Sequence, residues 1–232
     1  MIATRKYKQF VQPLLNQLAE NFLDGHAKIV FLFTDQEMAL NGHGTLVRQI
    51  VIPDYKFPQA TLYRYRVFKD NAGAFKGCSH LFYSDVDMGC VGKVKREILG
   101  DGLTVVRHPG FFGLGGWGSN NVHPESMAFV PEEARQKYFA GGFQGGKTEV
   151  YLKMCKELAA NIEDDEKRGI IAEHNDESHM NHYLVAHPDI PRIELDSGYC
   201  MVESVYLREN WKIDHLPVKI IALDKNHAEM RS

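Results

Sequence analysis

Two carboxylates that follow an apolar run are the residues in this sequence best suited to chemistry. Residues 81–84, Leu-Phe-Tyr-Ser, predict a buried strand, and Asp85 and Asp87 come directly after it. Ligands of open α/β sheets gather at the carboxyl ends of strands, and two carboxylates placed there can converge on one divalent cation. Mn²⁺ fits such hard oxygen ligands, and so does Mg²⁺. The alternative is an ordinary polar turn, because aspartate is common after strands.

A second acidic pair, Asp176 and Glu177, opens a predicted helix over residues 176–186. The helix macrodipole favours ionised carboxylates at this end, so Glu177 could stay anionic beside a developing positive charge. The competing interpretation is ordinary capping, in which Asn175 or Asp176 accepts hydrogen bonds from free backbone donors.

Three histidines near this pair, His174, His179 and His182, suggest a zinc site. No glutamate or cysteine completes a familiar zinc spacing around them. Surface or hydrogen-bonded histidines are therefore the favoured interpretation.

The glycine-rich segment over residues 139–146 matches neither the dinucleotide fingerprint nor the phosphate loop of nucleotide triphosphatases. Its glycines could let a bulky ligand such as a sugar approach the backbone closely. A tight turn from a strand into a helix explains them equally well.

The elements that must position these residues alternate between strands and helices, which predicts one α/β domain over residues 1–232. Strands are expected at 29–34, 46–52, 81–84, 103–107, 126–130 and 218–223, and helices at 7–23, 61–75, 94–99, 148–166 and 176–186. Residues 108–121 are loop by composition, and a mobile lid there would carry Trp117.

Composition narrows the classes of protein. At 232 residues and 44% hydrophobic, the chain can bury one large core, and a formal net charge of −3 argues against nucleic acid or anionic membrane as a partner. No apolar run is long enough to span a membrane. Four scattered cysteines without Cys-x-x-Cys pairing indicate a reducing compartment, so we expect a soluble, cytoplasmic protein.

Short motifs in a fixed order carry a resemblance. They are Thr61-Leu62-Tyr63-Arg64, Asp85-Val86-Asp87, His108-Pro109-Gly110-Phe111, Ala128-Phe129-Val130-Pro131, Ala140-Gly141-Gly142, Gly145-Gly146, Asp176-Glu177-Ser178-His179 with Asn181, and Tyr199-Cys200. In this order the sequence resembles family six of the retaining glycosyltransferases. That group contains the histo-blood group A and B transferases and the α-1,3-galactosyltransferases, with small bacterial and phage-type relatives.

The resemblance implies a GT-A fold, a single nucleotide-sugar domain built on a mostly parallel sheet flanked by helices. It implies transfer of N-acetylgalactosamine or galactose from its UDP form, in α-1,3 linkage and with retention, to a galactose-terminated glycan. Asp85 and Asp87 would hold Mn²⁺ against the UDP diphosphate, where the metal reverses the local charge and stabilises the leaving group.

Other roles follow from the resemblance residue by residue. The residues expected to bind the donor are Ile2, Ala3, Thr4, Tyr7, Arg64, Asp85, Val86, Asp87, Ala140, Gly141, Gly142, Asp176 and Lys225. Tyr7 is placed to stack on the uracil base, and the small side chains at 140–142 leave room for an N-acetyl group. The basic residues Lys219, Lys225 and Arg231 are candidates to order over UDP, with ordinary surface roles as the alternative.

Glu177 matches the carboxylate regarded as the catalytic centre of the family. It would either attack the anomeric carbon or stabilise an oxocarbenium ion while the acceptor enters. The residues expected on the acceptor side are His108, Trp117, His174 and Glu177.

The sequence also departs from the family pattern. The first strand of the family should precede Ile2, so we expect a sheet short by one strand or a truncated start. His174-Asn175 replaces a Trp-His pair, and residues 117–122 replace a block on the acceptor side. Small bacterial relatives often lack the aspartate pair that this chain keeps. A carbohydrate- or nucleotide-binding protein without transfer activity is one alternative, and transfer of another UDP-sugar is a second.

Overall fold

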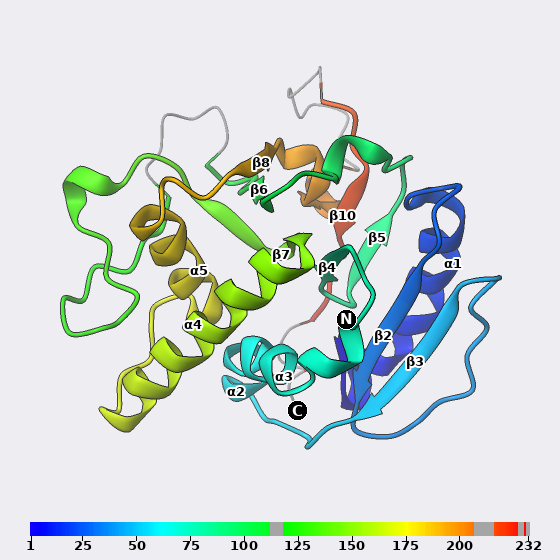
Figure 1. The fold of residues 1–232 in the computed structure, drawn as a ribbon, viewed down its shortest axis with the longest axis horizontal. Helices are drawn as coiled ribbons and strands as arrows, with labels where there is room; N and C mark the ends of the chain where they lie inside the picture. Colours follow the sequence, from blue (N-terminus) through cyan, green and yellow to red (C-terminus); the bar gives the residue numbers. More distant parts are fainter. Residues whose placement is uncertain (112–117, 207–215, 227–229, 231–232) are drawn as a thin grey trace.

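The chain forms a mixed α/β structure, shown in Figure 1. The computed structural model describes residues 1–111, 118–206, 216–226 and 230. Its strands are β1 (Ile2–Ala3), β2 (Ile29–Thr34), β3 (Leu46–Val51), β4 (His80–Ser84), β5 (Met88–Cys90), β6 (Leu103–Arg107), β7 (Phe139–Lys147), β8 (Arg192–Leu195), β9 (Met201–Val202) and β10 (Ile220–Ala222). Its α-helices are α1 (Val11–Asn21), α2 (Gln59–Leu62), α3 (Arg64–Asp70), α4 (Thr148–Lys167), α5 (Asn175–Ala186) and α6 (Glu203–Tyr206).

The strands form three small sheets, so the expectation of one mostly parallel sheet is wrong. Strands β1, β2 and β3 pair in parallel, whereas β7 runs antiparallel to both neighbours in the order β4-β7-β6-β8. Strand β10 pairs antiparallel with β5 and parallel with β9. Parallel pairing of neighbours requires a long crossover, usually helical, and no α-helix is assigned to the described residues between β6 and β7.

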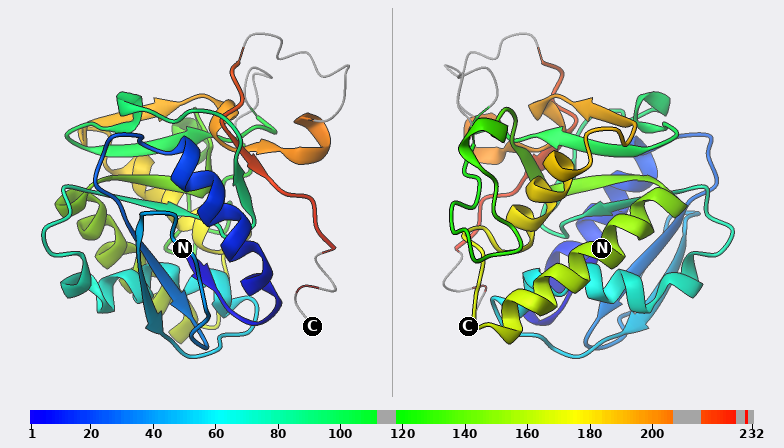
Figure 2. Two further views of the ribbon diagram at one scale, coloured as in Figure 1. Left: turned by 90° about the vertical axis from the view of Figure 1, so that its right-hand side faces the viewer. Right: turned by 60° about the vertical axis from the view of Figure 1, so that its left-hand side comes forward.

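Side chains of β2 alternate between two layers of helices, as expected for a strand buried on both faces. Phe31 and Phe33 pack into the main core with side chains from α3 and α4, whereas Leu32 packs on the other face with Val11 and Leu15 of α1. Figure 2 shows α1 on the opposite side of the sheets from α3 and α4. The carboxyl half of β2 is therefore buried between helices on both faces.

Several predicted helices differ in extent. The first is α-helical only from Val11, where Pro13 lies in the first turn, and a 3₁₀ helix precedes it over Arg5–Phe10. The helix expected at 61–75 is divided into α2, α3 and a 3₁₀ turn over Ala72–Phe75, and that expected at 94–99 is a 3₁₀ turn over Arg96–Ile98. Tyr63 separates α2 from α3, and Arg64, the first residue of α3, is buried in the interior.

The prediction of a strand at residues 126–130 is wrong, because this segment forms turns. The Ser126 hydroxyl donates to the buried Asp165 carboxylate at 2.6 Å, and the Met127 amide donates to the same carboxylate at 2.8 Å. The Phe129 amide donates back to the Ser126 carbonyl. Local hydrogen bonds to a helix side chain thus replace the ladder of a strand.

The glycine-rich segment is β7, and a tight turn does not explain it. A Cβ at Gly145 would lie 2.2 Å from the Leu81 carbonyl oxygen of β4, and one at Gly146 would lie 2.2 Å from the Gly102 carbonyl oxygen. These two glycines therefore let neighbouring backbones approach closely. Gly141 and Gly142, at the other end of the strand, face carboxylates instead.

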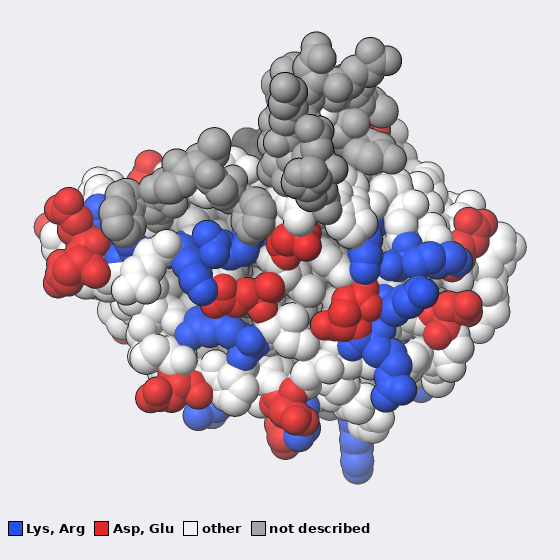
Figure 3. Space-filling view, turned by 90° about the horizontal axis from the view of Figure 1, so that it is seen from above, with Lys and Arg blue, Asp and Glu red and all other residues white. Residues whose placement is uncertain are grey.

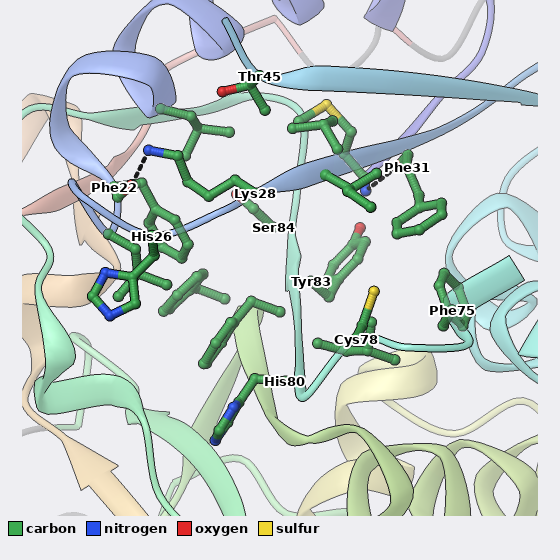
Figure 4. Close-up of a pocket in the computed structure, with 18 of the residues that line it drawn as sticks. Phe22, His26, Lys28, Phe31, Thr45, Phe75, Cys78, His80, Tyr83 and Ser84 are labelled. Atoms are coloured by element: carbon green, nitrogen blue, oxygen red, sulfur yellow. Dashed lines mark hydrogen bonds between the residues drawn. The ribbon is translucent and has the colours of Figure 1, made fainter.

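A cavity of about 470 Å³ separates β2 from β4, as Figure 4 shows. Its walls include Phe31, Phe75, Phe22 and Tyr83, and Lys28 donates to the Phe22 carbonyl oxygen at 2.6 Å. The cavity is apolar on most sides, and β2 and β4 belong to different sheets.

Strand β1 pairs with only two residues of β2, Phe33 and Thr34. The expectation that the sheet is short by one strand, compared with the family, stays a prediction.

Surface and membrane properties can be stated for the described part of the chain. None of its helices is long and apolar enough to cross a bilayer. Acidic and basic side chains are interspersed on the face shown in Figure 3. All four cysteines carry free thiols.

Candidate active site

A pocket of about 290 Å³ gathers most of the residues expected to bind the donor. Thr4 follows β1 and Asp85 follows β4, so the carboxyl ends of two strands open into it. The predicted residues in its wall are Ile2, Thr4, Tyr7, Arg64, Asp85, Val86, Asp87 and Lys225. The wall also contains residues that were not expected to bind the donor, namely Arg5, Tyr55, Lys56, Phe57, Ala60, Thr61, Tyr83 and Met230.

Asp85 is held by two groups at the end of β4. The Tyr83 hydroxyl donates to Asp85 Oδ1, and the Arg64 Nη2 group lies 3.2 Å from the same oxygen. Tyr83 and Asp85 are two residues apart, so the alternation of a strand places them on one face. That spacing is the signal by which Tyr83 could have been found from the sequence.

Arg64 joins the two acidic pairs. Its Nε group lies 2.9 Å from Asp176 Oδ2, and its Nη1 group donates to the Gly141 carbonyl oxygen at 2.8 Å. The guanidinium also lies over the Tyr83 ring, 4.3 Å from the centroid. Although burial opposes the charge, Asp176 and other neighbours raise the pKa of Arg64 well above its ordinary value. The guanidinium is therefore a fixed cation between β4, β7 and α5.

Asp87 is paired with Lys225 from the C-terminal segment. The Lys225 ammonium contacts Asp87 Oδ2, and this carboxylate is 6% exposed. The pairing follows from strand register, because Ala222 of β10 lies opposite Met88 of β5 and the Leu223 amide donates to the Asp87 carbonyl oxygen at 3.0 Å.

The aspartate pair fits a divalent cation. Both side chains line the same pocket, and the Asp87 Oδ2 atom is buried where a positive charge, the Lys225 ammonium, already contacts it. Two carboxylates supply the hard anionic oxygens that Mn²⁺ and Mg²⁺ take as ligands.

Glu177 lies on the first turn of α5, and its Oε2 atom accepts a 2.6 Å hydrogen bond from the Gly141 amide. The capping interpretation of this pair is wrong. The N-cap residue is His174, whose side chain makes no cap hydrogen bond, and Asp176 turns inward to Arg64. Burial raises the pKa of Asp176 to about 7, and Arg64 opposes that rise.

The residues at 140–142 separate into two environments. Ala140 is buried in a hydrophobic cluster around β5 and β7. A Cβ on Gly141 would lie 3.3 Å from Glu177 Oε2, and one on Gly142 would lie 3.3 Å from Asp85 Oδ2. The two glycines therefore keep the space between the carboxylates of β4 and α5 free.

A cluster of aromatic rings lies near Glu177. The Tyr138 ring packs against His108, with centroids 5.6 Å apart, and against Phe111 and His174. Burial and the nearby Glu177 carboxylate raise the pKa of Tyr138, while burial lowers the pKa of His108. The predicted acceptor residues His108 and His174 thus lie together, and Tyr138 was missed. Trp117 lies outside the described residues.

Other candidates do not reach the pocket. Ala3 is 1% exposed and packs in the core beneath α1. His179 contacts Asp165 at 3.5 Å, and the His182 ring lies 2.6 Å from the Phe129 carbonyl oxygen. Lys219 pairs with Glu97. The contacts of His179 and His182 support the interpretation of these two histidines as hydrogen-bonded. Within the described residues, no group of three or more His, Cys, Asp or Glu side chains could hold a metal ion.

Comparison with known proteins identifies the class of enzyme. The sequence model of glycosyltransferase family 6 matches residues 1–232. The histo-blood group ABO system transferase 1 of Rattus norvegicus is 27% identical over 241 residues, which cover 100% of this chain and 67% of the rat protein. The globoside alpha-1,3-N-acetylgalactosaminyltransferase 1 of Mus musculus is 28% identical over 199 residues, which cover 81% of this chain and 56% of the mouse protein. The O-antigen biosynthesis glycosyltransferase WbnI of Escherichia coli is 23% identical over 187 residues, which cover 78% of this chain and 79% of that protein. The chain belongs to glycosyltransferase family 6, and it is a hexosyl-transferring enzyme.

Proposed function

We propose that this protein transfers N-acetylgalactosamine, or failing that galactose, from its UDP donor in α-1,3 linkage to a galactose-terminated glycan, with retention of the α configuration. Membership of the family implies a GT-A fold. The observation that carries the proposal is that Arg64, in the wall of the pocket, contacts Asp85 of one acidic pair and Asp176 of the other. Glu177, which follows Asp176, accepts a hydrogen bond from the amide of Gly141, and the carbonyl of Gly141 accepts one from Arg64.

The nucleotide half of the donor occupies the pocket in this proposal. Tyr7 stacks on the uracil, and Ile2 and Thr4 line the base and ribose positions at the end of β1. The sugar then extends toward Gly141 and Gly142, where the missing side chains leave room for an N-acetyl group. Asp176, held by Arg64, accepts hydrogen bonds from sugar hydroxyls.

Asp85 and Asp87 hold Mn²⁺ in the proposal, with Mg²⁺ as an alternative. When bound, the cation neutralises the diphosphate and stabilises UDP as it leaves. Without a cation the two carboxylates would repel a diphosphate. Arg64 lies 3.2 Å from Asp85, so it fixes that carboxylate at the edge of the pocket.

Glu177 is the catalytic residue of the proposal. Its Oε2 atom is fixed by the Gly141 amide, which leaves the other oxygen available to face the anomeric carbon. A carboxylate there either forms a covalent bond with that carbon or stabilises the positive charge that develops on it. Both routes preserve the α configuration.

The acceptor enters past His108, Tyr138 and His174. Aromatic rings give a flat apolar surface on which a sugar ring can stack, and the ring nitrogens can bond hydroxyl groups. The names of the globoside relatives, which specify alpha-1,3-N-acetylgalactosamine transfer, support the linkage and the sugar.

Replacement of Glu177 by glutamine tests this proposal. Glu177→Gln keeps the shape of the side chain but loses the anionic charge, so we expect UDP affinity to be unchanged and transfer to fall about 10³-fold. UDP binding is measured by calorimetry and transfer by release of UDP from UDP-N-acetylgalactosamine. Glu173→Gln, an identical change at an exposed residue four positions earlier, is the control and should leave both unchanged. Full activity of Glu177→Gln would remove this residue from the mechanism.

A further inference from the structure

The two carboxylates of the aspartate pair have different cation partners within the chain. Asp85 contacts Arg64, and Asp87 contacts Lys225. The side chain of Asp87 is 8% exposed and that of Lys225 is 16% exposed. Each carboxylate therefore has an opposite charge beside it without any added cation.

Lys225 can leave Asp87 more easily than Arg64 can leave Asp85. Arg64 is 7% exposed at its side chain and is fixed by Asp176, the Gly141 carbonyl oxygen and the Tyr83 ring. Lys225 follows β10 by three residues, and its ammonium lies 5.1 Å from the centroid of the Tyr7 ring at the mouth of the pocket. A flexible lysine on a chain segment beyond a three-residue strand moves at lower cost than a buried arginine with four partners.

A divalent cation cannot share Asp87 with an ammonium at contact distance. Both need the same carboxylate oxygen, and two positive charges that close repel each other. The Lys225 ammonium would therefore compete with a cation for this oxygen of Asp87.

We propose that Lys225 is a built-in competitor of the divalent cation at Asp87, and that cation binding expels Lys225 from the aspartate pair. This inference rests on the metal role given to Asp85 and Asp87 in the proposed function. Lys225 itself lines the donor pocket, so its expulsion removes one positive charge from the pocket wall.

Cation affinity gives the first test. Mn²⁺ binding is measured without UDP, from the electron paramagnetic resonance signal of the free ion, for the wild type, Lys225→Met and Lys8→Met. Methionine keeps the length of the side chain but removes the charge. We expect Lys225→Met to bind Mn²⁺ about tenfold more tightly, a typical coupling between competing ligands. Lys8→Met is the control, because it also removes one positive charge, from a lysine that pairs with Asp35 at 3.1 Å. This variant should change the Mn²⁺ affinity little.

Chemical reactivity of the lysine gives the second test, in the folded wild type. Acetylation with a limiting active ester is followed by mass spectrometry with and without saturating Mn²⁺. Lys225 should be protected without the cation and react about tenfold faster with it, while Lys8 should react at one rate throughout. The reactivity of Lys225 reports expulsion directly, whatever the activity of the enzyme.

The outcomes separate this inference from the proposed function. Mn²⁺ binding that is equal in the wild type and Lys225→Met, with unchanged reactivity of Lys225, overturns the competition and leaves the metal role standing. Absence of Mn²⁺ binding in both proteins overturns the competition and the metal role together. Tighter binding in Lys225→Met with faster acetylation under Mn²⁺ supports the inference.

Discussion

Arg64 is the residue on which the geometry of the site depends. It contacts Asp85 after β4, Asp176 on α5 and the Gly141 carbonyl oxygen on β7. Each contact would be weak on the surface, but together they fix one buried guanidinium between three elements. A lysine cannot replace these contacts, because a single ammonium lacks the planar fork.

Loss of Arg64 should therefore destabilise the fold as well as the site. Arg64→Met leaves the buried Asp176 without a partner, and we expect the free energy of unfolding to fall by about 3 to 5 kcal/mol. Urea denaturation measures the change. Adding Asp176→Asn removes the uncompensated charge, so the double variant should recover part of the loss. A single variant as stable as the wild type would show that the ion pair has no structural role.

The choice of donor sugar is expected to depend on Gly142. A Cβ there would lie 3.3 Å from Asp85 Oδ2 and 3.5 Å from Cys200 Sγ, so alanine narrows the space between β7 and the aspartate pair. We expect Gly142→Ala to lower kcat/KM for UDP-N-acetylgalactosamine about tenfold more than for UDP-galactose, because one methyl group in a pocket is worth about 1–3 kcal/mol. Competition between the two donors measures the ratio. An unchanged ratio would contradict the steric explanation.

Sequence alone singled out the charged residues of the candidate site but missed two of its tyrosines, Tyr83 and Tyr138. Asp85 and Asp87 follow an apolar strand, and the acidic pair of α5 opens a helix, so local pattern was sufficient for them. Tyr138 gave no such signal. Its place beside Glu177 depends on the pairing of β7 with β6 and on packing against α5, which are contacts between distant parts of the chain.

At the scale of elements, β7 and β10 position the site. Strand β7 presents Gly141 to Glu177 and pairs with β4, so the two acidic pairs lie on opposite sides of its first half. Strand β10 carries Lys225 toward Asp87. The glycines of residues 139–146 marked this segment as unusual, but the sequence did not predict that it forms a strand. Glycine is unfavourable in strands. At Gly145 and Gly146 it is explained by the close approach of the backbones at Leu81 and at Gly102.

A cluster around Glu97 ties the 3₁₀ turn at Arg96–Ile98 to the segment that leads into β10. Glu97 Oε1 accepts hydrogen bonds from the Lys219 ammonium at 2.5 Å and from the Tyr199 hydroxyl at 2.8 Å. Partial burial opposes ionisation, yet these hydrogen bonds lower the pKa of Glu97 from 4.5 to about 2. The carboxylate therefore stabilises the folded state at neutral pH.

Stability should depend on pH through this residue. Because its folded pKa is lowered, the contribution of Glu97 is complete above about pH 4.5 and is lost as the pH falls toward 2. The side chain is 35% exposed, so we expect Glu97→Gln to cost only about 1 kcal/mol at pH 7 and nothing near pH 2. Urea denaturation at the two pH values measures the difference. Glu149→Gln, at a carboxylate 76% exposed, is the control and should cost little at either pH, whereas an equal cost of Glu97→Gln at both would contradict the assignment.

At the scale of the whole molecule, the alternation of strands and helices was predictable but the sheets were not. The apolar runs that became β2, β4 and β6 have the length and composition of buried strands, and α4 follows a helical period. The start of α5 was signalled by its polar residues instead. Which strands pair, and in which direction, depends on connections and on contacts far apart in sequence. The cavity between β2 and β4 is a result of that assembly, and no local pattern signals it.

In the proposed function, this arrangement transfers a sugar with the anomeric configuration of the donor preserved. Glu177 on α5 lies near the aromatic cluster of His108 and Tyr138, and Arg64 links the preceding residue, Asp176, to the pocket. Donor and acceptor would meet at Glu177.

The most direct test is the linkage of the product. The protein is incubated with UDP-N-acetylgalactosamine, Mn²⁺ and a galactose-terminated oligosaccharide, and the new anomeric proton is examined by nuclear magnetic resonance. We predict an α-1,3-linked N-acetylgalactosamine on the terminal galactose, formed by the wild type and not by Glu177→Gln. A β-linked product, or none with either UDP-N-acetylgalactosamine or UDP-galactose, would contradict the account.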